Sequence, residues 1–93
     1  MFTISRKSEA KGFKVEFLYA LEKGHQVMLA GSFNDWEQIP MLFSDGAYRV
    51  TVELSSGDHE YRFVVDDTWQ TDETNPNFTA NDFGTLNSVL HVD

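Results

Sequence analysis

The feature that most constrains this fold is a two-residue alternation of apolar and polar side chains, repeated in short runs between turn signals. The clearest run lies between the turn residues 44–46 and 55–58, and its apolar positions are Tyr48, Val50, Val52 and Leu54. Strands that are half-buried in a sheet have this period, because successive side chains point to opposite faces. No stretch of useful length has the period of an amphipathic helix. The sequence therefore predicts an all-β protein.

The same pattern, or a short apolar run, recurs along most of the chain. We expect strands over residues 13–20, 26–32, 48–54, 59–66 and 86–92, with shorter extended pieces at 41–43 and around Trp69. Pro40 excludes a central strand at its position, since proline cannot donate to the ladder. Residues 72–84 have little periodicity, and loops of that length are usually functional or disordered. About seven short strands between turns are typical of an antiparallel β-sandwich of immunoglobulin-like type.

Composition limits the organisation of the chain and its partners. A chain of 93 residues forms one domain, in which we expect residues 1–12 to be a loose lead-in and residues 13–93 to be the sandwich. The net charge of -8 would repel phosphate backbones and anionic lipids, so neither nucleic acid nor a membrane is an expected partner. The N-terminal residues lack the apolar stretch of a signal peptide, which predicts a cytoplasmic protein.

Groups that could carry catalysis or hold a metal are scattered. The chain has no cysteine, which excludes disulfides and thiolate metal sites. The acids that cluster in sequence are Asp66, Asp67, Asp72 and Glu73, and we interpret them as solvated turn residues, because a glycosidase needs two carboxyls held across a groove. The histidines His25, His59 and His91 fall on different expected elements without ligand spacing. The sequence predicts no enzymatic activity, no metal and no cofactor.

Two tryptophans lie on polar loops, where a core residue is least expected. Trp36 follows the turn-forming residues 31–35, and Trp69 follows a turn at Asp66 and Asp67. Each ring could instead fold over a sheet end as a lid on the core. The strand alternation places further groups away from the core, which are Arg62, Phe83, Thr85 and Asn87. Flat rings, a cation, a hydroxyl and an amide could therefore meet on one face.

This set of side chains suits a sugar. Indole rings can cover the apolar C–H face of a pyranose while arginine and asparagine bond its hydroxyls. If each ring removes about 50–100 Å² of apolar surface from water, it contributes about 1–2.5 kcal/mol. We therefore expect a dissociation constant between roughly micromolar and millimolar, strengthened by repeats along a polymer.

Several motifs, taken in order, resemble the family 48 carbohydrate-binding modules. They are residues 27–36 (VMLAGSFNDW), Pro40-Met41, residues 57–66 (GDHEYRFVVD), Trp69, Asn75-Pro76 and residues 83–90 (FGTLNSVL). The family includes the glycogen-binding domain of the AMP-activated protein kinase β subunit and the N-terminal domains of isoamylases and branching enzymes. The resemblance covers about residues 13–93. It implies an early-set immunoglobulin-like sandwich that binds α-1,4-glucans such as glycogen, starch and maltooligosaccharides without catalysis.

The resemblance also implies roles for single residues. Trp36 and Trp69 match the two stacking tryptophans, Arg62 stands at a lysine position, Phe83 at that of a leucine beside the glucan ring, Thr85 matches a hydroxyl ligand and Asn87 the sugar-binding amide. Arginine keeps the charge of lysine but has a forked geometry, so the two are not equivalent. Asp67 replaces a usual glycine after Asp66, where a left-handed backbone would be strained.

Two other functions stay open at this point. The sandwich could be a docking or regulatory domain that contacts a kinase or a glycoside hydrolase, with sugar binding lost or secondary. It could also be the accessory part of an enzyme, with a catalytic barrel elsewhere. Many members of the enzyme branch lack the full binding set, so the nearly complete set here favours glucan binding.

Overall fold

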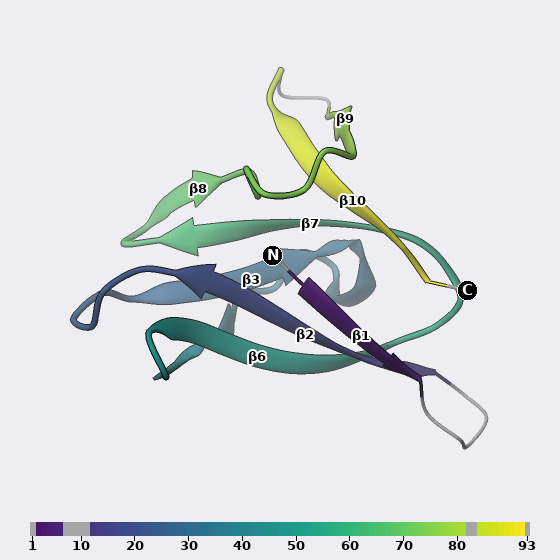
Figure 1. Ribbon diagram of the computed structural model, residues 1–93. Coiled ribbons are helices and arrows are strands. Elements are labelled where there is room, and N and C mark those ends of the chain that lie inside the picture. Colours follow the sequence, from purple (N-terminus) through teal and green to yellow (C-terminus); the bar gives the residue numbers. More distant parts are fainter. Residues whose placement is uncertain (1, 7–11, 82–83, 93) are drawn as a thin grey trace.

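The strands form two antiparallel sheets that pack face to face, and Figure 1 shows the two layers. The computed structural model describes residues 2–6, 12–81 and 84–92. Its elements are β1 (Phe2–Arg6), β2 (Phe13–Ala20), β3 (Val27–Gly31), the 3₁₀ turn η1 (Ser32–Asn34), β4 (Ile39–Pro40), β5 (Leu42–Ser44), β6 (Ala47–Leu54), β7 (Gly57–Val65), β8 (Thr68–Gln70), β9 (Phe78–Ala80) and β10 (Leu86–Val92). One sheet has the order β1-β2-β6-β5 and the other β4-β3-β7-β10-β9, with β8 also paired to β7. The predicted all-β sandwich is confirmed.

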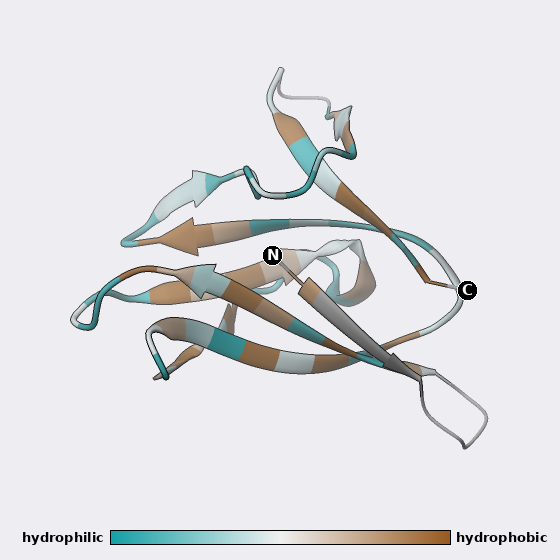
Figure 2. Cartoon of the chain, viewed as in Figure 1, coloured by the Kyte–Doolittle hydropathy of each residue, from teal (hydrophilic) through white to brown (hydrophobic). Residues whose placement is uncertain are grey.

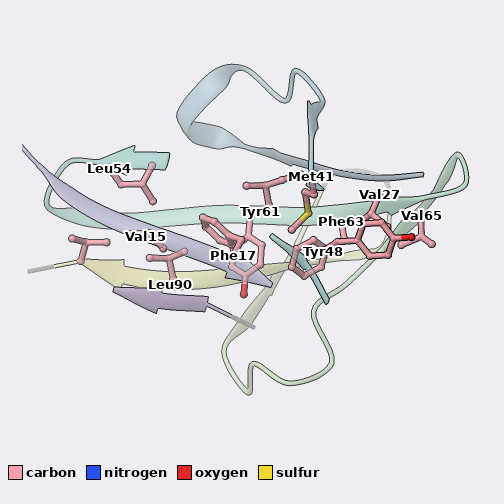
Figure 3. Packing of buried hydrophobic residues seen from close by; sticks show 12 residues of the cluster. Val15, Phe17, Val27, Met41, Tyr48, Leu54, Tyr61, Phe63, Val65 and Leu90 are labelled. Atoms are coloured by element: carbon pink, nitrogen blue, oxygen red, sulfur yellow. The ribbon is translucent and has the colours of Figure 1, made fainter. Parts of the chain in front are cut away.

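The core lies between the sheets and is made by the inward half of the alternation. Figure 2 shows apolar and polar bands alternating along β2 and β6. Phe17, Tyr61 and Phe63 are fully buried, and the rings of Phe17 and Tyr61 meet edge to face at 4.9 Å between centroids. Figure 3 shows these rings packed together between the sheets.

In the part of the chain that the structure describes, no helix is long and apolar enough to cross a membrane.

The N-terminal residues differ from the sequence prediction. Residues 2–6 form β1, which pairs antiparallel with the whole first half of β2, and are not a loose lead-in. The ring of Phe2 lies 6.3 Å from that of Phe17 and 6.2 Å from that of Tyr61. The pairing with β2 decides their conformation. Pro40 lies on the edge strand β4, as its missing donor requires.

The segment between β8 and β10 contains a buried polar cluster. Asp72 is only 3% exposed, so its interpretation as a solvated turn acid is wrong. Its carboxylate accepts hydrogen bonds from the hydroxyls of Tyr61, at 2.6 Å, and Thr74, at 2.7 Å. Its own N–H donates to the Ser88 hydroxyl at 2.9 Å. Burial would raise the pKa of Asp72, but hydrogen bonds to the carboxylate, including those from Tyr61 and Thr74, hold it below its usual value.

Candidate functional site

The site forms where β7 changes partner along one edge. β10 pairs with residues 57–61 of β7, and β8 pairs with residues 63–65. Arg62 falls between these two pairings, while on the other edge it lies opposite Ala30 of β3. Figure 1 shows β8 and β10 on the same side of β7, diverging from it. β7 therefore places the outward side chain of Arg62 at the gap between β8 and β10.

Trp69 is held by a tight hairpin between β7 and β8. The pairing of Val65 with Thr68 leaves a two-residue turn, in which Asp66 has φ 49° and Asp67 has φ 69°. Positive φ at both positions is the pattern of a type I′ turn. The left-handed conformation anticipated at Asp67 is present, and aspartate is one of the residues that adopt it most readily. The turn thus keeps its geometry without glycine.

The side chain of Asp66 anchors that hairpin to the start of β3. Its Oδ1 accepts a hydrogen bond from the Gln26 amide at 2.9 Å, and its Oδ2 lies 2.7 Å from Nδ1 of His25. The bond from the Gln26 backbone, followed by that from His25, holds the pKa of Asp66 below its usual value. The base of the Trp69 hairpin is therefore fixed by side-chain as well as backbone bonds.

Trp36 is positioned by the loop that follows β3. Its N–H donates to the carbonyl of Gly31 at 2.9 Å, and both Asp35 (φ 57°) and Trp36 (φ 63°) are left-handed. This conformation is uncommon for a bulky residue, and such strain persists where the surrounding structure enforces it. Gly31 allows the loop to lie close, because a Cβ there would meet the Phe33 ring and come within 2.6 Å of the Glu60 carbonyl.

The two indole rings meet at the rim of a cavity, which we call the cradle. The centroids of Trp36 and Trp69 are 6.4 Å apart and their planes are inclined by 54°. The cradle has a volume of ≈ 860 Å³. Its lining includes five residues predicted from sequence, which are Trp36, Arg62, Trp69, Thr85 and Asn87, and four that were not, which are Ser32, Glu60, Ala80 and Asn81.

Polar side chains are linked across the floor of the cradle. Nη1 of Arg62 donates to the Thr85 hydroxyl at 3.3 Å, and Nδ2 of Asn81 donates to the same oxygen at 2.7 Å. Asn81 also donates to Oδ1 of Asn87 at 3.1 Å, and Nδ2 of Asn87 donates to Oε1 of Glu60 at 2.9 Å. These bonds join β7, β10 and the end of β9 and fix the directions of the remaining donors and acceptors.

Arg62 contacts both the floor and the rim. Its guanidinium carbon lies 5.8 Å from the Trp69 ring centroid, within the range of a cation–π interaction. Burial lowers the pKa of Arg62, although guanidinium stays protonated throughout the accessible pH range. Its Nε is buried and has no hydrogen-bond partner among the described residues.

The structure brings together five of the six site residues predicted from sequence. Phe83 lies outside the described residues, so its position stays a prediction. Trp36 is half-buried and does not belong to the core cluster, which argues against a lid on the core. Of the residues that were missed, Glu60 shares the outward face of Arg62 and could have been found from that parity. Asn81 lies in the irregular segment after β9, where no periodic signal exists, and Ser32 begins η1, although the sequence predicted it as the last residue of a strand.

Side chains of the metal-ligating kinds do not gather in the described residues. Within them, no group of three or more histidine, aspartate and glutamate side chains is placed to hold a metal ion. The charged side chains that line the cradle there are Glu60 and Arg62. The cradle therefore combines aromatic surface with fixed hydrogen-bonding groups, which suits recognition of a polyhydroxylated ligand.

Known proteins share this sequence pattern. The family model for the glycogen recognition site of AMP-activated protein kinase matches residues 14–93. The chain is 36% identical over 69 residues to the 5'-AMP-activated protein kinase subunit beta-1 of Sus scrofa, covering 74% of this chain and 56% of that protein. It is 38% identical over 72 residues to the human subunit beta-2, covering 76% of this chain and 26% of that protein. The chain thus spans between about a quarter and just over half the length of these relatives.

The fold, the site and these matches together define a carbohydrate-binding module of the β-sandwich type. The chain belongs to the family of the AMP-activated protein kinase glycogen recognition site, a family of the carbohydrate-binding module 48 kind.

Proposed function

We propose that this chain binds α-1,4-glucans such as glycogen, starch and maltooligosaccharides, and that it does so without catalysing a reaction. The observation that carries the proposal is the pair of indole rings, one from the loop after η1 and one from β8, whose centroids lie 6.4 Å apart in the lining of a cradle with polar side chains. The family match to a glycogen recognition site supports the same ligand class. We place the site inside the cell, as the sequence predicts.

In this proposal Trp36 and Trp69 stack on successive glucose rings. Their planes are inclined by 54°, which suits a chain that turns between residues, as an α-1,4-glucan does. Arg62, Thr85 and Asn87 form hydrogen bonds with the hydroxyls, and Phe83, which lies outside the described residues, is expected to contact a glucose ring. Each stacked ring contributes about 1–2.5 kcal/mol. The resulting affinity for a single oligosaccharide lies between roughly micromolar and millimolar.

Native gel electrophoresis with embedded glycogen or amylopectin tests this function. The native protein is expected to be retarded, and Trp36→Ala and Trp69→Ala to migrate freely while keeping a cooperative unfolding transition. Phe43→Ala is a matched control, because Phe43 is also a partly exposed aromatic but lies on β5, in the other sheet. Free migration of the native protein, together with no calorimetric heat on titration with β-cyclodextrin, would refute glucan binding.

A second candidate is docking to a protein partner. It is favoured by the curated relatives, which are subunits of a protein kinase and extend well beyond the matched region. In this case the chain is a regulatory or docking domain that contacts a kinase, or a glycoside hydrolase, and sugar binding is lost or secondary. Failure of the gel and calorimetric tests would favour docking. A glycoside hydrolase barrel encoded in the same reading frame would point to the enzyme partner.

A further inference from the structure

Glu60 lies on the floor of the cradle but has no assigned role. It is two residues from Arg62 on the same outward face of β7, and both side chains line the cavity. Among the described residues, the ion pairs do not include one between these two groups. A carboxylate and a guanidinium thus lie side by side in a binding site without neutralising each other directly.

The hydrogen bonds of Glu60 leave part of its carboxylate available to a ligand. Oε1 accepts from Nδ2 of Asn87 at 2.9 Å, while the Asn87 Oδ1 accepts from Asn81. The amide of Asn87 is thereby held from both sides in one orientation. Within the described part of the chain, Oε2 of Glu60 has no hydrogen-bond donor. A carboxylate can accept about four hydrogen bonds, and those from hydroxyls to a charged oxygen are about twice as strong as neutral ones.

The surroundings of the cradle are also acidic. Asp35 and Glu37 flank Trp36, Asp66 and Asp67 precede Trp69, and all four are exposed. The only basic group that lines the described cradle is Arg62, which is bonded to Thr85 and lies over Trp69. A phosphate monoester adds about -1.5 to -2 charges at neutral pH. Such a group would enter a field in which acids outnumber the single cation, on a protein of net charge -8.

We propose that Glu60 is a specificity-determining residue of the glucan site. Its carboxylate accepts hydrogen bonds from the hydroxyls of uncharged glucose units and, together with the four exposed acids next to the tryptophans, disfavours units that carry phosphate. The inference rests on the proposed glucan binding and deepens it. It predicts a module that distinguishes unmodified from phosphorylated regions of an α-glucan.

Calorimetric titration with two probes tests the inference on the native chain. The probes are maltoheptaose and maltoheptaose carrying one 6-phosphate group, each at about 20 mM and about 500 mM salt. At low salt, the phosphorylated probe is expected to bind roughly three- to tenfold more weakly, and the difference is expected to shrink at high salt, because screening removes the repulsion. Equal or tighter binding of the phosphorylated probe would overturn the inference. Absence of binding to either probe would overturn glucan binding itself, and the inference with it.

Glu60→Gln isolates the contribution of this side chain, because it keeps the shape and an acceptor for Asn87 but removes the charge. The variant is expected to bind maltoheptaose about three- to tenfold more weakly and to lose most of its discrimination against phosphate. Glu22→Gln is the control, since it makes the same change in net charge at an exposed turn that does not line the cradle. Identical behaviour of the two variants would overturn the role of Glu60. If Glu60→Gln does not fold, the two-probe comparison on the native chain still decides the inference.

Discussion

The hydroxyl of Tyr61 donates a 2.6 Å hydrogen bond to the buried carboxylate of Asp72 and so ties the centre of β7 to the segment that follows β8. Nδ2 of Asn75 donates to the same Tyr61 oxygen at 3.1 Å and to the Val89 carbonyl at 2.9 Å. This segment leads into β9 and Asn81, which form one wall of the cradle. The buried cluster thereby connects the core to the site.

Tyr61→Phe is expected to destabilise the fold by about 1–3 kcal/mol, because the carboxylate of Asp72 and the amide of Asn75 each lose a buried partner. The thermal midpoint of a domain of this size would fall by roughly 4–8 °C for each kcal/mol. Tyr19→Phe is the control, since among the described residues the hydroxyl of Tyr19 donates only one long hydrogen bond, to Oε1 of Gln70 at 3.5 Å. Equal midpoints for the two variants, measured by circular dichroism, would contradict the importance of the cluster.

Stability is expected to fall in acid through Asp72. Its folded pKa lies below the ordinary value of 3.8, so the unfolded chain binds more protons there than the folded one. The contribution is complete above the unfolded pKa and is lost as pH falls through the folded pKa. Urea unfolding between pH 7 and 2 should show this loss. In Asp72→Asn that part of the pH dependence should disappear, whereas Asp45→Asn, at an exposed turn, should retain it.

Tyr61 should make the cluster sensitive to base as well. Burial, with the neighbouring Asp72 carboxylate, raises the pKa of Tyr61 well above its ordinary value of 10.0. The unfolded chain therefore loses this proton first, and the contribution to stability, complete below pH 10, falls as the pH rises further. The free energy of unfolding of the native protein should be lower at pH 11 than at pH 9, and this difference should be smaller in Tyr61→Phe. An equal drop in both would place the base-sensitive group elsewhere.

Gly31→Ala is expected to disturb both stability and binding. Its Cβ would meet the Phe33 ring and approach the Glu60 carbonyl to 2.6 Å, so the loop that carries Trp36 must move. Overpacking of this kind costs about 1–3 kcal/mol, and the displaced indole should abolish retardation by glycogen. Gly46→Asn is the control, because a Cβ at Gly46 meets nothing within 4 Å and asparagine tolerates its positive φ of 80°. Normal retardation of Gly31→Ala would show that the loop does not depend on this contact.

Thr85→Val should weaken glucan binding without unfolding the domain. The change removes an oxygen that accepts hydrogen bonds from Arg62 and Asn81, both of which line the cradle. The loss of positioning and of one sugar-binding hydroxyl is expected to raise the dissociation constant for maltoheptaose about three- to tenfold. Thr51→Val, on an exposed position of β6, should bind as the native protein does. Indistinguishable calorimetric titrations of the two variants would exclude a role for the Thr85 hydroxyl.

The local sequence pattern was sufficient to predict which side chains are buried where a strand presents one face to the core. The alternation in β7 separated Tyr61 and Phe63 from Arg62, and the structure buries the first two completely. The same parity placed Thr85 and Asn87 with Arg62, and the cradle contains all three. A period of two carries this information because a side chain on a strand can point only to one face or the other.

The class of fold and five of the side chains that line the cradle followed from the sequence. The three-dimensional structure was needed to show that residues 2–6 form β1, that Asp72 is buried, and that Ser32 and Asn81 join the predicted residues in the cradle. These outcomes depend on partners distant in sequence. β7 exchanges β10 for β8 at Arg62, which brings Trp69 into the lining of the cradle, and such a change of partner leaves no periodic trace in the chain.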